Sequence, residues 1–405
     1  MMKSKEDRLS NLPDCVLLHI LSFFEANHAV QTCVISTRWM NLWKHLPTLR
    51  LSSTHNKSFK GSYSNLVSRI LSLRDDSTTL HTLDFICDQN FMEPDTFVKS
   101  IRNIQQLRIS IITCDIRKFP PWLFSCQTLT SLDLFVHPDM MHIVFPNSLI
   151  LPALTTLTLK YFILSSGSGH DGCSTGEPFS GFKKLNTLII QCCHVLNADT
   201  LSISSTTLVN LTLSGPVLYE YKLSTPSLCN FVLTGFLTND ILFESDISSV
   251  KHVYIDALIG PSCTAEKDSL FLLSWLLQFA NITSLTLSSS TLQVLSSVPD
   301  LFKVKLTSLC NLESLKIKMK VISPEAYIAL GNSNSSKQQG SKFELKQSTF
   351  IPDGVVDYLL QNTSSAELHF ISHYKKISTL RQSKLQFATV GNVAIVHLRQ
   401  FSNRR

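Results

Sequence analysis

The feature that most constrains the fold of this chain is a pattern of three apolar positions, Leu-x-x-Leu-x-Leu, that recurs along most of its length. Other aliphatic or aromatic residues replace leucine in some copies. Full copies begin at Leu80, Ile104, Leu129, Leu154, Leu185, Leu208, Leu228, Val250, Ile282 and Leu312, and a weaker copy begins at Ser365. Successive full copies start 20 to 32 residues apart. Spacing of this kind indicates an array of repeated structural units.

Repeats of this length and composition are typical of leucine-rich-repeat solenoids. Each unit supplies one short strand whose alternate leucines enter a shared core, and no unit can bury that face without its neighbours. We therefore predict an α/β fold in which the repeats form a parallel sheet on the concave side, joined by short irregular return segments. An ordinary α/β domain would need long amphipathic helices between its strands, and the shorter intervals leave no room for them.

Three segments are insertions between regular repeats. Residues 165–178 are rich in Gly and Ser, and residues 331–341 are rich in Asn, Ser, Gln and Gly, so we predict that both are loops. The insertion between Val250 and Ile282 contains the apolar run 270–279, which predicts a helix on the convex side.

The outward positions of the predicted strands are the candidate target-binding residues, because solenoids usually bind their partners on the concave strand face. They are mostly small and polar, without a stripe of charge: Thr156, Thr158, Lys160, Asn210, Thr212, Ser214, His252, Tyr254, Asp256, Ser284, Thr286 and Ser288. A solvated strand face without a partner explains each of them equally well. The pattern therefore does not identify the target.

Composition excludes several classes of protein. Apolar residues make up 44% of the chain and charged residues 16%, a balance that disfavours disorder. The net charge of +6 is diffuse except after Glu367, where the charged residues are all basic, so we do not expect a nucleic-acid partner. The sequence has no secretory signal and no apolar run of the ~20 residues that a bilayer span needs. We predict an intracellular protein of the nucleus, the cytoplasm or both, without a membrane partner.

The sequence offers no candidate catalytic or metal-binding residues. None of the eleven cysteines forms a Cys-x-x-Cys pair, and Cys192-Cys193-His194 is too cramped for a tetrahedral metal site. There is no Gly-rich phosphate loop, no Gly-x-Ser-x-Gly elbow and no His-Glu-x-x-His motif. We therefore predict that the protein is not an enzyme and holds no metal and no cofactor.

The first fifty residues predict three short helices. Leu12-Pro13-Asp14 opens the first, because proline suits the first helical turn and an acidic residue complements the helix dipole. Its apolar face comprises Val16, Leu17, Ile20, Leu21 and Phe24. Asn27 is the predicted N-cap of the second helix, which carries Val30, Cys33 and Val34. Ser36 is the predicted cap of the third, which carries Trp39, Leu42 and Trp43 and ends before Pro47.

These helices carry more large apolar side chains than about forty residues can bury by themselves. The set comprises Leu17, Leu18, Ile20, Leu21, Phe23, Phe24, Val34, Ile35, Trp39 and Trp43. A self-contained helical bundle would hide all of them. We expect some to stay exposed as a patch, and exposed apolar patches mark interfaces.

Residues 7–52 resemble the F-box of plant F-box/LRR-repeat proteins along their whole length. The shared features are the Leu12-Pro13 start, the pairs Val16-Leu17 and Ile20-Leu21, and the ending Ser36-x-Arg38-Trp39-x-Asn41-Leu42-Trp43. The resemblance implies docking to a Skp-type adaptor and, through it, to a cullin scaffold. The adaptor-binding residues that it implies are Leu12, Pro13, Val16, Leu17, Ile20, Leu21 and Val34, with Trp39 and Trp43 at the core or edge of the module.

The resemblance further implies a substrate-recognition adaptor of an SCF-type ubiquitin ligase, in which the repeats hold an unknown target protein. Two departures from the F-box pattern favour an alternative. Cys15 stands where an acidic residue is usual, and residues 25–28 lack the usual apolar residue and proline between the first two helices. The alternative is a repeat scaffold for protein interactions whose F-box no longer docks.

The predicted organisation is an F-box over residues 1–51, a connecting segment over 52–79, a repeat solenoid over 80–320 and an irregular region over 321–405. In the last region, residues 350–370 are distantly similar to the helix-then-strand ending of the FBD region that plant F-box/LRR proteins often carry. We therefore predict a final repeat or an FBD-like remnant there.

Overall fold

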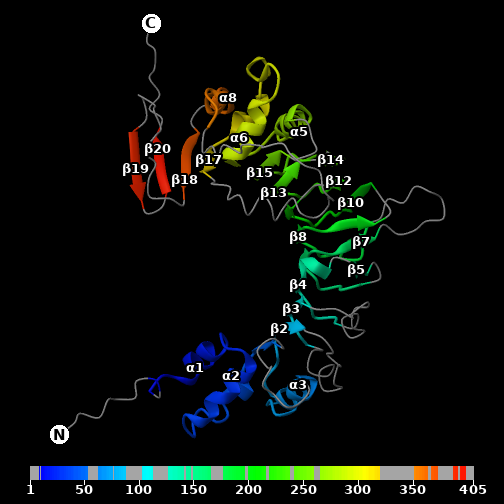
Figure 1. The fold of residues 1–405 in the computed structure, drawn as a ribbon, viewed down its shortest axis with the longest axis vertical. Helices are drawn as coiled ribbons and strands as arrows, with labels where there is room; N and C mark the ends of the chain where they lie inside the picture. Colours follow the sequence, from blue (N-terminus) through cyan, green and yellow to red (C-terminus); the bar gives the residue numbers. More distant parts are fainter. Residues whose placement is uncertain are drawn as a thin grey trace, which may run out of the picture. The chain divides into compact units, whose positions relative to one another are not determined.

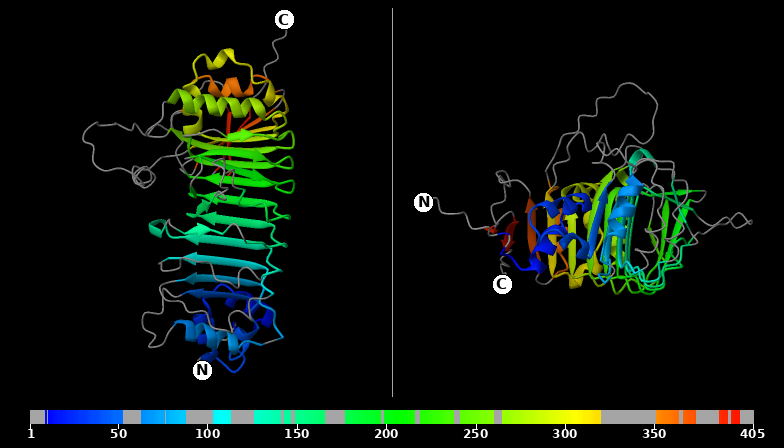
Figure 2. Two further views of the ribbon diagram at one scale, coloured as in Figure 1. Left: turned by 90° about the vertical axis from the view of Figure 1, so that its right-hand side faces the viewer. Right: turned by 90° about the horizontal axis from the view of Figure 1, so that it is seen from below.

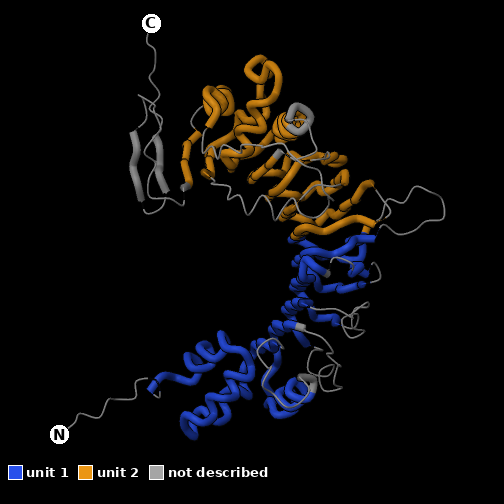
Figure 3. The backbone as a smooth tube through the Cα atoms, in the orientation of Figure 1, with its two compact units in different colours: residues 1–167, 178–188 blue, residues 168–177, 189–405 orange. Residues whose placement is uncertain are grey.

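The computed structural model of the chain divides into two compact units, residues 1–167 with 178–188 and residues 168–177 with 189–405 (Figure 3). It describes residues 9, 11–52, 63–75, 77–87, 103–112, 126–140, 143–146, 149–165, 177–196, 199–215, 219–237, 241–259, 265–319, 351–363, 366–372, 386–390 and 393–397. The fold is α/β, with helices at the N-terminus followed by open sheets of mainly parallel strands, and Figure 1 labels the elements.

The first unit opens with two α-helices, α1 (Asp14–Leu21) and α2 (Ala26–Gln31). The prediction of α1 is confirmed, with Asp14 in its first turn and Pro13 just before it in an extended conformation. The predicted N-cap of the second helix is wrong, because α2 begins two residues earlier than Asn27 would allow and has Glu25 at its N-cap. The Asn27 side chain instead accepts a hydrogen bond from the backbone N–H of His28 at 2.9 Å.

The third predicted helix is also wrong as an α-helix. Its segment forms turns followed by a short 3-10 helix, η2 (Leu42–His45), and the end of the predicted second helix forms another 3-10 helix, η1 (Thr32–Val34). Within the described part of the chain, the Ser36 hydroxyl has no hydrogen-bond partner, so the cap that an α-helix start needs is missing. Tighter turns nevertheless bring Trp39, Leu42 and Trp43 into the core of the module.

The sheet of the first unit follows the predicted repeats. Its parallel strands have the order β1-β2-β3-β4-β6. The bounds are β1 (Thr48–Ser52), β2 (Thr82–Cys87), β3 (Gln106–Ile111), β4 (Ser131–Val136) and β6 (Thr156–Lys160). The unit boundary falls inside β8 (Thr187–Gln191), whose first residue donates its N–H to the carbonyl of Thr155 at 2.9 Å. The predicted strand positions are confirmed, because the leucines of each copy are buried as expected.

Strand β1 is one repeat more than the sequence pattern predicted. Leu46, Leu49 and Leu51 have the same spacing as the other copies and are buried, and β1 pairs in parallel register with β2. The signal was hidden because these residues lie inside the stretch that resembles an F-box. The first strand of the repeat sheet is therefore supplied by the end of the helical module. Helix α3 (Tyr63–Ser72) lies in the predicted connecting segment.

The second unit holds a sheet of strands in the order β11-β13-β15-β16-β17-β18-β20-β19, and the left view of Figure 2 shows the green strands of this unit side by side. The first six are parallel, and β20 and β19 are antiparallel to their neighbours. Their bounds are β11 (Asn210–Ser214), β13 (Asn230–Leu237), β15 (His252–Ile259), β16 (Ser284–Ser288), β17 (Ser314–Met319), β18 (Glu367–Ser372), β19 (Gln386–Val390) and β20 (Val393–His397). The weak eleventh copy is confirmed as a strand, β18.

The sequence predicted irregular return segments, and this prediction is wrong for several repeats. In the second unit they form a parallel sheet of β10 (Thr200–Ser204), β12 (Glu220–Ser224) and β14 (Ile241–Phe243), with β9 (His194–Leu196) before it. In the first unit β5 (Val144–Phe145) pairs with β7 (Ile163–Ser165), and η4 covers Pro138–Met140. Alternate residues of the return strand β12, such as Tyr221 and Leu223, are buried, so a repeat with such a return contributes apolar side chains from two strands.

Helices complete the second unit. The helix predicted in the insertion is confirmed as α5 (Ala265–Gln278), whereas α6 (Ser289–Ser296), η5 (Leu301–Lys303) and η6 (Thr307–Asn311) were not predicted. Helix α8 (Val355–Leu360) precedes β18, as the helix-then-strand prediction required. The two predicted loops fall almost wholly on residues 166–176 and 320–350, which lie outside the described residues.

Two glycines allow β11 and β13 to lie side by side. Gly215 directly follows β11 and Gly235 lies within β13, with φ angles of 109° and 130°. The N–H of Gly215 donates to the carbonyl of Thr234 at 2.8 Å. A Cβ atom on Gly235 would lie 2.0 Å from the carbonyl oxygen of Gly215, so the close approach of the two backbones excludes a side chain there.

We predict that Gly235→Ala lowers the free energy of unfolding by more than about 3 kcal/mol, because the strained φ and the backbone clash add together. The matched control is Gly354→Ala. Gly354 also has a positive φ, of 76°, but its added Cβ would approach only the Phe302 side chain, at 3.4 Å. The control should lose about 1 kcal/mol in a denaturant titration. Equal losses for the two variants would contradict the assigned clash.

Candidate functional site

The helical module at residues 9–51 leaves a large part of its apolar surface uncovered. Val34 is 85% exposed, Phe23 60% and Ile35 56%. Around half of the Leu9, Met40, Phe24 and Val16 side chains is exposed as well, or somewhat less. We call these seven residues the F-box apolar face. Monomeric proteins rarely leave so many large apolar residues uncovered in so short a segment, so a partner is expected to cover them.

Four of the nine predicted adaptor-binding residues lie in the core of the module. Leu17 and Leu21 are 0% exposed, and Trp39 and Trp43 are nearly as deeply buried. Their position allows them to support the apolar face from beneath and not to touch a partner. Of the other five, Pro13, Val16 and Val34 are exposed, and Leu12 and Ile20 are half-buried. A direct contact of these five with an adaptor stays a prediction.

Helical spacing does not separate core from surface residues in the F-box, because part of residues 9–51 is not helical. Ile35 and Met40 lie in the turns between η1 and η2, where side chains do not follow a 3.6-residue period. Phe23 follows the end of α1, and its ring packs edge-on against His19 at 5.0 Å. The excess of large apolar residues in the sequence indicated Phe23 and Ile35, whereas nothing in the sequence pattern indicated Met40.

Arg38 joins the two ends of the module. Its Nε donates to Asp14 Oδ1 at 2.9 Å, and its Nη2 donates to the carbonyl of Leu12. The carboxylate and the carbonyl therefore both fix the turn that carries Arg38 to the start of α1. This connection holds the apolar residues of the 3-10 segment beside those of the first helix.

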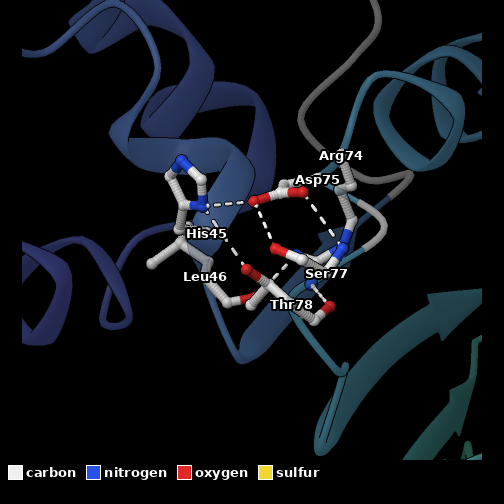
Figure 4. A network of polar contacts seen from close by, with 6 residues as sticks. All are labelled: His45, Leu46, Arg74, Asp75, Ser77 and Thr78. Carbon is white, nitrogen blue, oxygen red and sulfur yellow. Dashed lines mark hydrogen bonds and ion pairs between the residues drawn. The ribbon is translucent and has the colours of Figure 1, made fainter.

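A second polar network connects η2 to the segment after α3, within the first unit (Figure 4). Arg74 Nη1 donates to the carbonyl of Leu46 at 2.6 Å, and Arg74 Nη2 donates to the carbonyl of Thr78 at 3.3 Å. His45 Nδ1 lies 2.9 Å from Asp75 Oδ2. The helical module is thus tied to the first repeats by side chains as well as by the shared strand β1.

The surroundings shift the pKa values of two charged groups in this network, Arg74 and Asp75. Burial lowers the pKa of the Arg74 guanidinium, and the neighbouring Asp75 opposes that effect. Hydrogen bonds from the backbone N–H and the hydroxyl of Ser77, at 3.0 and 2.8 Å, hold the pKa of Asp75 below its ordinary value. Both groups therefore stay charged at neutral pH and keep the junction connected.

The outward face of the first unit's sheet carries a row of alternating charges. Arg50, Asp84, Arg108 and Asp133 are successive partners in the strand register, and Thr158 follows them. Arg108 Nε lies 2.9 Å from Asp133 Oδ2, and its Nη1 lies 3.8 Å from Asp84 Oδ2. The positive and negative side chains of the row therefore pair with one another. Of the predicted target-binding residues in this unit, Thr156 and Lys160 are half-buried and Thr158 is buried.

The predicted target-binding residues of the second unit also differ in exposure. His252 is exposed, and Asn210, Thr212 and Tyr254 are half-buried. Asp256 is only 3% exposed, because it accepts hydrogen bonds from Tyr254 at 3.2 Å and from Ser290 at 3.5 Å. Burial and then Asp256 raise the pKa of Tyr254, so its hydroxyl remains a donor. Asp256 therefore holds the Tyr254 side chain in place on the outward sheet face and is itself too buried to contact a target.

Ser288 is likewise covered. Its hydroxyl accepts from the N–H of Thr291 at 3.1 Å and so caps helix α6. The predicted outward positions on β16 thus reduce to Ser284 and Thr286, which are half-buried. No group of three or more His, Cys, Asp or Glu side chains able to hold a metal ion occurs among the residues that the structure describes. None of the described helices combines the length and the apolar character that a bilayer crossing requires.

This geometry defines a class of protein that combines an uncovered apolar face on a small helical module with a polar sheet face on a repeat array. Comparison with known proteins identifies both parts. Residues 9–51 match the F-box domain family. An F-box/LRR-repeat protein of Arabidopsis thaliana is 27% identical over 294 residues, which cover 68% of this chain and 93% of that relative.

For other relatives from the same plant, the matched region covers a smaller share of the relative's length. A putative F-box/FBD/LRR-repeat protein is 26% identical over 351 residues, 78% of this chain and 69% of the relative. F-box/LRR-repeat protein 13 is 26% identical over 319 residues, 71% of this chain and 66% of the relative. Residues 9–51 are therefore an F-box domain, and the chain is a relative of the plant F-box/LRR-repeat proteins. F-box domains generally bind Skp-type adaptors, which makes this chain a protein-interaction adaptor.

We predict that Arg108→Met destabilises the first unit by about 1 kcal/mol at neutral pH and by less in acid. Burial raises the pKa of Asp84, Arg108 and Arg50 lower it, and Asp133 raises it. Without Arg108 the pKa of folded Asp84 rises further above its unfolded value. A carboxyl with a raised folded-state pKa stabilises the fold only at low pH, and that contribution is lost as the pH rises from about 4 through the folded pKa.

The measurement is the free energy of unfolding at pH 3.5 and at pH 7, for wild type and variant. Arg69→Met is the control, since Arg69 is an exposed residue of α3 outside the charged row. The difference between Arg108→Met and wild type should grow with pH, whereas the control should stay near wild type at both values. A difference that is the same at both pH values would show that Arg108 does not balance the two carboxylates.

Proposed function

We propose that this chain is the substrate receptor of an SCF-type ubiquitin ligase. Its F-box binds a Skp-type adaptor, which connects it to a cullin scaffold, and its repeats bind a target protein. The observation that carries the proposal is the F-box apolar face, whose most exposed member, Val34, is 85% exposed. An uncovered face of this size on an F-box domain favours a protein partner.

The chemistry of such a receptor is proximity. A target lysine held near ubiquitin that is loaded on another subunit reacts as if its concentration were greatly raised, so the receptor needs no catalytic side chain. A rigid connection between the docking module and the target-binding repeats serves this task. The shared strand β1 and the hydrogen bonds of Arg74 to Leu46 and Thr78 supply such a connection within the first unit.

The proposed division of labour follows the predicted organisation, with residues 1–51 for docking, 52–79 as connection, 80–320 for target binding and 321–405 as an FBD-like end. Within the docking module, Pro13, Val16 and Val34 are the predicted residues with exposed side chains. Phe23, Phe24, Ile35 and Met40 extend the contact. Leu17, Leu21, Trp39 and Trp43 hold these residues in position from the core.

The changed segment between the first two helices does not prevent α2 from forming. Glu25 has φ −62° and ψ 148°, an extended conformation from which α2 starts, and Ala26 is buried where the helix begins. The junction therefore forms without the usual proline. This observation supports a docking-competent F-box over the alternative of a scaffold that no longer docks.

We predict that Val34→Asp with Ile35→Asp reduces recovery of a plant Skp-type adaptor at least about tenfold, because two charges would be buried without partners in the interface. The measurement is a pull-down of the purified adaptor by the full chain. Val144→Asp with Ile150→Asp is the matched control, since these exposed apolar residues lie in the repeats of the same unit.

Circular dichroism establishes that both double variants keep the wild-type fold, which the high exposure of all four side chains favours. The control should recover as much adaptor as wild type. No recovery by wild type would favour the interaction scaffold, and equal recovery by the Val34 and Ile35 variant would remove the apolar face from the docking site.

A further inference from the structure

Strand β17 presents two lysines on the outward face of the second unit's sheet. Leu315 and Ile317 are 0% exposed and point into the core, so the alternating residues Lys316 and Lys318 point outward. The neighbouring outward residues are Thr286 on β16 and His369 on β18, which are the register partners of Lys316. Sequence analysis had not selected this strand, because two lysines among polar residues form no obvious stripe.

The carboxylates near these lysines are turned away or occupied. Asp256 is buried and accepts hydrogen bonds from Tyr254 and Ser290. Glu367 Oε2 lies 3.3 Å from His369 Nε2 and can pair with that imidazole. Among the described residues no carboxylate lies within ion-pair distance of Lys316 or Lys318, in contrast to the charged row of the first unit, where Arg108 lies beside both Asp84 and Asp133.

Lys318 is held in place over an aromatic ring. Its Nζ lies 5.4 Å from the ring centroid of Tyr254, on the strand two positions away in the sheet. The lysine can reach so far because the intervening residues of β16, Thr286 and Ser288, are small and Ser288 is buried. A cation–π contact of this kind restrains the flexible lysine, so less rotamer freedom remains to be lost when an anion binds.

We propose that the outward face of β15 to β18 binds an acidic, extended segment of the target protein, with Lys316 and Lys318 as the charge-recognising residues. The inference rests on the proposed receptor function and names the chemistry of its target. Residues two apart in a strand lie about 6.4–6.8 Å apart. An extended peptide presents alternate side chains on one face at the same spacing, so its acidic side chains can reach Lys316 on β17 and the ammonium group of Lys318 above Tyr254.

A nucleic acid fits this face less well. Binding to phosphates usually needs a longer basic stripe with accessible aromatic rings, and here one face of the Tyr254 ring is already occupied by Lys318. The hydroxyl of Tyr254 is also engaged with Asp256. The two lysine ammonium groups match a short acidic peptide in charge.

The test is a selection of short random peptides, displayed on phage, on the immobilised full chain. Asp and Glu should be enriched at alternate positions of the selected peptides. The selected peptide is then synthesised and titrated by fluorescence anisotropy against wild type and two variants. Lys316→Gln with Lys318→Gln should weaken binding about tenfold, and added salt should weaken binding to wild type, because exposed ion pairs are screened.

Lys222→Gln with Lys305→Gln is the matched control, with the same change of charge on β12 and on the loop between η5 and η6 of the same unit. It should bind within about twofold of wild type. The inference is overturned by a selection without acidic enrichment, or by equal affinities for both double variants. It is also overturned if single-stranded RNA, as a second probe, loses affinity with the Lys316 and Lys318 variant while the acidic peptide does not.

Adaptor recovery by the same variants separates this inference from the proposed function. Lys316→Gln with Lys318→Gln should recover the Skp-type adaptor as wild type does, because the F-box lies in the other unit. Peptide selection without adaptor recovery would reject the ligase receptor and keep the acidic-segment site. Adaptor recovery without peptide selection would do the reverse.

Discussion

An apolar side chain can be hidden only where enough chain surrounds it, and this limit shapes both parts of the molecule. Each repeat contributes a few leucines that cannot be buried without the next repeat, so the strands stack into open parallel sheets. The helical module has the same shortage of covering chain but no further copy of itself. Leu17, Leu21, Trp39 and Trp43 fill its small core, and Val34, Ile35 and Phe23 remain outside. The repeats cover their leucines within the chain, whereas the F-box leaves several large apolar side chains exposed, which is the basis of the proposed adaptor docking.

The two parts are joined by structure that belongs to both. Leu46, Leu49 and Leu51 end the F-box sequence and at the same time begin the repeat sheet through β1. Arg74 and Asp75 then connect the segment after α3 back to η2 by hydrogen bonds and an ion pair. Such a junction holds the helical module against the first repeats, which suits the proposed function of holding a target in place.

The sequence predicted the repeat strands well, because leucines at fixed spacing leave one arrangement that buries them. It predicted less where tertiary packing decides the local structure. The third F-box helix became 3-10 turns that bring both indoles inward, and the returns became strands because residues such as Tyr221 and Leu223 are buried in every second position. The alternation of residues along the strands predicted the candidate target face. It could not reveal that Ser288 bonds to Thr291 of helix α6, or that Ser290 of the same helix donates to Asp256. Lys316 and Lys318 stand out only once their neighbours are known.

The most direct test of the account measures whether a Skp-type adaptor covers the F-box apolar face. Hydrogen–deuterium exchange of the full chain, alone and with the purified adaptor, shows for each peptide whether adaptor binding protects its backbone amides. The account predicts slower exchange in peptides that contain Phe23, Phe24, Val34 and Ile35, with little change in the strands of the second unit. Adaptor binding with unchanged exchange across residues 9–51, or no binding at all, would contradict the claim that this face is made to be covered.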